Sequence, residues 1–379
     1  WYTGRDADSL AYQAVKYRQR EGWSHRDLLR LAHPRTDDAG LRATFDWIAH
    51  AGLGEATPAL IEGFVKAQQA TDADAWARIV RDYRLTWEML PTAALTQPVV
   101  WEALLDVGVP MTALIRQLPR LTRLGLLPAI GGRTQEVCAQ LTDAKRLRAA
   151  RVHPVNVLVA QRTYASGTSY RGTTKWTPTT KVTDALDAAF YAAFGAVEPS
   201  GKRTMLALDV SWSMGMSISG MRISAREASA ALALVQLATE PEAVAYGFSD
   251  AGSGMWSDSA LTQLDISPRR RLDDALAAVD AMDFGGTDCA LPMLYAIKQE
   301  LEVETFVVYT DNETWDGEVH PYQALQRYRE RSGIDARLIV VGMTSTGFSI
   351  ADPDDPGMLD VVGFDAAVPS LIAEFARGL

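Results

Sequence analysis

The hydrophobic positions of residues 1–195 recur at helical spacing, separated by short polar or glycine-containing interruptions. In the first segment Leu10, Ala14 and Tyr17 lie three or four residues apart, and Gly22 follows as a stop. Further helices are predicted over residues 27–32, 41–51, 57–69, 73–85, 98–107, 111–124, 134–141, 155–164 and 182–194. Strand-like alternation is almost absent, and short connections make neighbouring helices antiparallel. The pattern therefore predicts a solenoid of helical hairpins with irregular repeats.

After residue 200 the pattern changes to short apolar strands that alternate with helices. Residues 205–208 form a continuous apolar run, which is typical of a strand buried on both faces. Further strands are predicted at 243–248, 305–309, 337–341 and 359–363, with helices at 224–239, 272–282, 291–301, 322–330 and 370–375. This alternation predicts a doubly wound, mostly parallel sheet. We therefore divide the chain into a helical domain, residues 1–197, and an α/β domain, residues 198–379.

Composition narrows the class of protein. The 379 residues contain no apolar stretch long enough to cross a bilayer, no recognisable signal peptide and only two cysteines, Cys138 and Cys289. We expect a cytoplasmic protein that does not bind membranes.

The charge is unevenly distributed along the chain: residues 1–200 hold 24 basic and 20 acidic residues, whereas residues 201–379 hold 13 basic and 27 acidic residues. The overall charge of −10 therefore does not exclude a nucleic-acid ligand, because only a local basic surface is needed.

Oxygen-bearing side chains gather where the predicted strands end. Asp209, Ser211 and Ser213 follow the first strand, Thr287 lies in a loop after glycines, and Asp311 follows a later strand. The carboxyl ends of parallel strands meet at one edge of a sheet, where ligands bind in open α/β folds. Carboxylates and hydroxyls are the oxygen ligands that Mg²⁺ prefers. The five residues therefore predict a site for Mg²⁺ or another divalent cation.

Basic residues cluster near the start of the chain. We predict that Lys16 and Arg20 share one helix face, with Arg18 beside it, and the turn that follows adds His25, Arg26, Arg30 and His33. Two further clusters contain Arg116, Arg120 and Arg123, and Lys145, Arg146, Arg148, Arg151 and His153. Each cluster is either an ordinary solvated surface or a surface that grips nucleic-acid phosphates.

Catalysis is the less favoured class. The residues around Ser211 miss the Gly-x-Ser-x-Gly nucleophile motif at its first position, and Asp209 lacks the second nearby carboxylate of an aspartyl-phosphatase. The sequence contains neither a Walker A motif nor a dinucleotide-binding fingerprint, and its five histidines are scattered.

The five oxygen-bearing residues resemble the metal-ion-dependent adhesion site of von Willebrand factor A domains, Asp-x-Ser-x-Ser followed by Thr and then Asp. Trp212 departs from the small residue expected there but removes no ligand. The segments 10–20, 22–34, 284–293 and 309–315 extend the likeness: the whole chain resembles the Ro autoantigen family, an RNA-binding TROVE module followed by a von Willebrand A domain.

The resemblance implies a ring of HEAT-like helical hairpins and a non-catalytic RNA-binding scaffold that acts in RNA quality control. It implies that small non-coding Y RNA binds the outer face, with Lys16, Arg20 and His33 as the matching contacts. It also implies that single-stranded 3′ ends of misfolded RNA bind a central hole, and that polynucleotide phosphorylase is a partner. The first residues resemble the interior of the family's sequence, so we expect this sequence to lack the helices that precede this point in the family, either as a natural short form or as a fragment.

Two other functions fit the same residues. The α/β domain would serve as an adhesion or chaperone-like module in which the bound metal captures a partner's carboxylate and no RNA is involved. A hydrolase is the third interpretation.

Overall fold

The computed structural model describes the chain except for residues 171, 249–260, 268, 283–286, 312–317 and 345–349. Parts of the 284–293 and 309–315 segments therefore lie outside the described residues. The chain forms two compact units, residues 1–134 and 135–379, which are treated separately below. Among the described residues, none of the helices is both long and apolar enough to span a membrane.

The first unit is helical, as the hydrophobic pattern predicts. Its helices are α1 (Ala7–Lys16), α2 (His25–Ala32), α3 (Ala39–His50), α4 (Ala59–Gln69), α5 (Ala73–Tyr83), α6 (Pro98–Val107) and α7 (Met111–Arg123), with short 3₁₀ turns at Trp87–Met89 and Ala94–Thr96. Acidic N-caps begin several of them: Asp6, Asp38 and Asp72 each accept a hydrogen bond from an amide three residues later. Leu10, Ile61, Trp101 and Leu114 are among the fully buried side chains.

One local prediction is wrong: Arg20 does not lie on the first helix. Helix α1 ends at Lys16, and the chain then forms a hairpin of two short antiparallel strands, β1 (Gln19–Arg20) and β2 (Trp23–Ser24). Glu21 and Gly22 make the turn with φ of 51° and 80°. Two consecutive residues with positive φ reverse the chain within a two-residue loop, which ends any helix before it.

The second unit opens with helices α8 (Thr134–Leu141), α9 (Ala144–Ala149), α10 (Pro154–Ala165) and α11 (Thr180–Ala192), followed by a 3₁₀ turn at Ala193–Ala196. Helices α10 and α11 bury Leu158 and Leu186. Both helices bond to the α/β part: Arg162 pairs with Glu227, and the Leu272 amide donates to the Tyr191 hydroxyl over 2.7 Å. These contacts explain why residues 135–197 belong to the same compact unit as the sheet.

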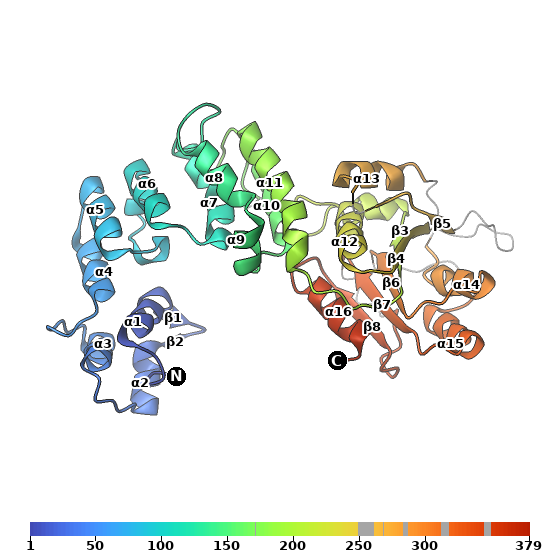
Figure 1. The fold of residues 1–379 in the computed structure, drawn as a ribbon, viewed down its shortest axis with the longest axis horizontal. Helices are drawn as coiled ribbons and strands as arrows, with labels where there is room; N and C mark the ends of the chain where they lie inside the picture. The colour runs from blue at the N-terminus through green and yellow to red at the C-terminus, as the bar shows by residue number, and fades with distance from the viewer. Residues whose placement is uncertain (171, 249–260, 268, 283–286, 312–317, 345–349) are drawn as a thin grey trace. The chain divides into compact units, whose positions relative to one another are not determined.

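The α/β part contains a six-stranded sheet in the order β5-β4-β3-β6-β7-β8 (Figure 1). The strands are β3 (Thr204–Asp209), β4 (Ala243–Phe248), β5 (Leu261–Gln263), β6 (Thr305–Thr310), β7 (Arg337–Gly342) and β8 (Met358–Val362). All pairings are parallel except that between β4 and the edge strand β5. The helices are α12 (Ala225–Thr239), α13 (Leu272–Asp280), α14 (Leu291–Lys298), α15 (Pro321–Ser332) and α16 (Val368–Arg377). The sequence prediction of a mostly parallel sheet is confirmed, although it missed β5 and α9.

The central strands are buried on both faces. Met205 and Ala207 of β3 pack with Met293 of α14 and Leu325 of α15, whereas helix α12 contacts β3, β4 and β6. The Tyr309 hydroxyl donates to Gln236 of α12, which ties β6 to that helix. A continuous apolar strand needs cover on both sides, and these helices provide it.

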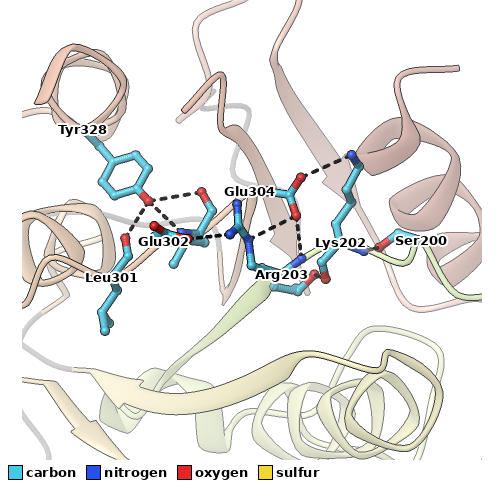
Figure 2. Close-up of polar contacts among 9 residues, drawn as sticks. Ser200, Lys202, Arg203, Leu301, Glu302, Glu304 and Tyr328 are labelled. Carbon is cyan, nitrogen blue, oxygen red and sulfur yellow. Dashed lines mark hydrogen bonds and ion pairs between the residues drawn. The ribbon is translucent and has the colours of Figure 1, made fainter. Parts of the chain in front are cut away.

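The amino ends of β3 and β6 are joined by charged and polar contacts (Figure 2). Glu304 accepts from the Arg203 amide over 3.1 Å and pairs with Lys202 over 3.3 Å. Arg203 also pairs with Glu302 over 2.6 Å. The Tyr328 hydroxyl donates to the Leu301 carbonyl over 2.7 Å and accepts from the Val303 amide over 2.7 Å. Charges at this end of the sheet are therefore paired, which sets it apart from the opposite end.

Candidate functional sites

The five predicted oxygen ligands meet at the carboxyl edge of the sheet. Strand β3 ends at Asp209, whose carboxylate accepts from the Ser211 amide over 2.8 Å and from the Thr287 hydroxyl over 3.3 Å. The hydroxyls of Ser211 and Ser213 lie 3.1 Å apart. Asp311 follows the last residue of β6, the strand that pairs with β3. We call Asp209, Ser211, Ser213, Thr287 and Asp311 the carboxyl-edge site.

This site concentrates buried negative charge. Asp209 is 1% exposed, and burial raises its pKa to about 6, with the neighbouring Asp311 carboxylate adding to the rise. Oδ1 of Asp311 is buried and has no hydrogen-bond partner among the described residues. A buried carboxylate oxygen without a donor is costly unless a cation satisfies it. Two carboxylates and three hydroxyls are a donor set suited to Mg²⁺, so these residues fit a divalent cation.

Sequence reasoning missed two residues that organise this site. The Thr310 hydroxyl donates to Asp209 over 2.9 Å. Arg226 donates to the Ser211 carbonyl over 3.1 Å and pairs with Asp280 over 2.7 Å, which joins the loop after β3 to helix α13. The position of Thr310 at the end of β6, beside Asp311, was a usable signal. No sequence signal pointed to Arg226, because its role depends on how α12 and α13 pack together.

The basic residues of the first unit form a second candidate site. Arg18, Arg20, Arg26, Arg30 and His33 are all exposed, and we call them together the basic face. Arg26 and Arg30 lie four residues apart on α2 and so share one side of that helix. His33 caps the end of α2 in the left-handed conformation, with φ of 44°. The exposed guanidinium groups can meet an anionic ligand without displacing any buried group.

Lys16 is less accessible than the sequence suggests. Its ammonium donates to the Tyr12 hydroxyl over 3.1 Å, lies 5.2 Å and 5.4 Å from the ring centroids of Tyr12 and Tyr17, and stands 3.9 Å from Glu88. The aromatic rings and Glu88 hold the charge at the end of α1. Lys16 therefore borders the basic face as a positioned charge.

His25 is bound within the protein. Its Nδ1 lies 2.9 Å from the Tyr2 hydroxyl, and its ring stacks with that of Trp1 at 5.9 Å. Burial lowers the pKa of His25 below its ordinary value, which favours the uncharged ring. His25 thus supports the base of α2 and adds no charge to the basic face.

The other two basic clusters differ from the basic face. On α7, the Arg120 guanidinium is half-buried over the Trp101 ring at 5.8 Å, and burial lowers its pKa. On α9, Arg148 donates to the Gly195 carbonyl over 3.1 Å, and His153 after that helix is buried, which lowers its pKa to about 4. In both clusters, therefore, some of the basic side chains are engaged in contacts within the protein.

Comparison with known proteins gives matches over both parts of the chain. The family described as "TROVE domain" matches residues 2–51 and 49–202, and the family described as "Ro60 vWA domain" matches residues 203–376. A protein named RNA-binding protein RO60 from Deinococcus radiodurans is 44% identical over 383 residues, which cover all of this chain. One of the same name from Caenorhabditis elegans is 37% identical over 426 residues, again covering all of this chain.

A solved structure agrees with these matches. The crystal structure of the Deinococcus radiodurans RO (RSR) protein superposes with a TM-score of 0.90 at 42% identity, and the match covers all of this chain and 75% of that one. The match covers 70% of the Deinococcus relative's length and 64% of the Caenorhabditis relative's length.

Proposed function

This chain belongs to the Ro60 family, and from that membership we propose that it is a non-catalytic scaffold that binds RNA through the basic face. The observation that carries the proposal is the accessibility of Arg18, Arg20 and Arg30. Exposed arginines bind phosphate oxygens and release counterions, which supplies most of the affinity for a nucleic-acid backbone. Two relatives at 44% and 37% identity are named as RNA-binding proteins, which supports the same ligand.

We infer that the RNA is a small structured non-coding RNA of the Y type, with Lys16, Arg20 and His33 among its contacts. Arg20 lies on a hairpin and not on α1, but it remains exposed beside the end of that helix. Binding of the single-stranded 3′ ends of misfolded RNA, and a part in RNA quality control, stay predictions of the family resemblance.

Variants that remove exposed charge test the proposal. Arg20→Ala combined with Arg30→Ala should weaken binding of a stem–loop RNA about tenfold and flatten the dependence of log Kd on log salt by about two ions. The matched control is Arg327→Ala with Arg331→Ala, which removes two exposed arginines four residues apart from α15. Filter binding over a series of KCl concentrations measures both quantities. Equal losses in the two double variants would contradict the assignment of RNA to the basic face.

A second candidate function concerns the carboxyl-edge site. Its fit to a divalent cation, together with the exposed Trp212 and Met216 beside it, favours metal-dependent capture of a carboxylate on a partner protein. When bound, the cation would supply an electrophilic centre for that carboxylate. Polynucleotide phosphorylase is the first partner to test, by pull-down with Mg²⁺ and with EDTA. Retention in both conditions, or with Asp311→Asn, would rule out this role.

A further inference from the structure

We propose that the hairpin of Gln19–Ser24 binds an unpaired base of the RNA, which stacks on Trp23 while Arg20 holds a neighbouring phosphate. This inference rests on the RNA-binding function proposed above. It assigns to the hairpin a role that the charges of the basic face cannot perform, because charge alone does not distinguish paired from unpaired nucleotides.

The hairpin is not a shape that local energetics favour. Its strands are two residues long and largely exposed, and a hairpin of this size is marginal in water. Glu21 adopts φ of 51°, a left-handed conformation that strains a residue with a Cβ. Backbone strain of this kind clusters at ligand-binding and active sites, which makes the hairpin a candidate for a functional role.

Neighbouring elements hold the hairpin in place. On one side Tyr17 caps α1, and its amide donates to the Gln13 carbonyl over 2.9 Å. On the other side Ser24 begins α2: Asp27 accepts from the Ser24 amide over 3.0 Å and from the Ser24 hydroxyl over 2.6 Å. This capping box fixes the direction in which β2 enters α2. The side chains of the hairpin are therefore presented from two anchored ends.

The register places Trp23 directly opposite Arg20. Side chains of opposite residues in an antiparallel pair point to the same face, with their Cβ atoms about 5 Å apart. Trp23 is 53% exposed, and Tyr17 at the end of α1 is 44% exposed. An indole left so far in water adds little to folding, but it offers the largest stacking surface of any side chain. Arg20 beside it supplies the charge that a nucleotide's phosphate needs.

The charges around the hairpin favour a polyanionic ligand. Residues 16–35 contain six arginines and lysines and only two acidic residues, Glu21 and Asp27. Asp27 is engaged in the capping box. An exposed aromatic among arginines matches the platforms on which proteins stack unpaired bases beside a polyanionic backbone. A fully paired stem hides its base faces, so the hairpin should recognise a bulge, a loop or a single strand.

The test uses the full chain and two probes, a stem–loop RNA with an internal bulge and the same stem fully paired. Trp23→Leu keeps an apolar side chain but removes the ring, and should weaken binding of the bulged RNA about tenfold without changing that of the paired stem. Trp23→Phe should restore most of the loss. The salt dependence should stay that of the wild-type protein, because Trp23 contributes no charge.

A second measurement does not depend on any variant. 2-Aminopurine placed in the bulge should lose fluorescence when the wild-type protein binds, because stacking on an indole quenches it. Unchanged fluorescence, or equal weakening of both RNAs by Trp23→Leu, would overturn the inference while leaving the proposed RNA binding intact. Failure of the wild-type protein to bind either RNA would instead overturn the proposed function itself.

Discussion

The basic face and the carboxyl-edge site differ in the exposure of their charged groups. Arg20, Arg26 and Arg30 of the basic face stay in water, on a hairpin with two-residue strands and on a short helix, and exposing them costs little. The carboxyl-edge site buries Asp209 and Asp311 at the end of central strands, and among the described residues one carboxylate oxygen of Asp311 has no hydrogen-bond partner. An exposed surface of this kind suits a large, mobile polyanion whose binding is screened by salt. A buried cluster is preorganised for one small cation.

The largest effect should follow from changing the buried site. Asp311→Asn should weaken Mn²⁺ binding at least about 100-fold, because the carboxyl-edge site then keeps only one of its two carboxylates, that of Asp209. The same variant should leave the metal-free protein as stable as wild type, since Oδ1 of Asp311 has no donor to lose among the described residues. Electron paramagnetic resonance of free Mn²⁺ and a thermal melt in EDTA measure the two effects.

Asp335→Asn is the matched control, because that carboxylate is 97% exposed on the α/β part. Weakening of Mn²⁺ binding by Asp335→Asn to the same extent would show that the ion responds to overall charge, and the contrast between buried and exposed acids would fail.

A smaller effect is expected at His153, which the sequence places among basic residues but the structure buries. Its pKa of about 4 lies below the ordinary value of 6.5, because burial disfavours the charged ring. Between these two values the unfolded chain binds more protons, so the free energy of unfolding falls as the pH falls. From pH 7 to pH 5 the loss should be about 2 kcal/mol.

His153→Asn isolates this contribution. Asparagine keeps a side-chain acceptor for the Val155 amide at the start of α10 but does not titrate. Thermal melts of both proteins at pH 7 and pH 5 should show a larger decrease in Tm for wild type. Identical decreases would mean that the pKa of His153 is the same in the folded and unfolded protein, as it would be for an exposed ring.

The smallest expected effect is on RNA binding, when His25 is replaced. His25→Phe keeps an aromatic ring against Trp1 and should change RNA affinity at pH 7.5 by less than about twofold, with the salt dependence unchanged. Arg30→Ala should reduce the salt dependence by about one ion. A reduction of the same size in His25→Phe, measured by filter binding in KCl, would place His25 in the basic face after all.

The sequence by itself determined most of the helices and strands and grouped the residues of the carboxyl-edge site. Continuous apolar runs are typical of strands buried on both faces, so β3 and β6 could be predicted. Because parallel strands place their carboxyl ends at one edge of the sheet, Asp209 and Asp311 had to lie at the same edge. The sequence alone therefore groups these Ser, Thr and Asp residues. Helical periodicity likewise located α6 at residues 98–107 and α8 at residues 134–141.

Only the tertiary structure decided which charges are available. Lys16 and Arg20 look equivalent in sequence, yet Lys16 lies between two rings and Glu88, whereas Arg20 stands on a hairpin that a strained Glu21 and Gly22 create. His25 and His153 lie in basic stretches, but burial lowers the pKa of both rings. Exposure and pKa depend on what other parts of the chain bring into contact, and periodicity carries no record of those contacts. For the same reason the roles of Arg226 and Trp23 became visible only in the folded chain.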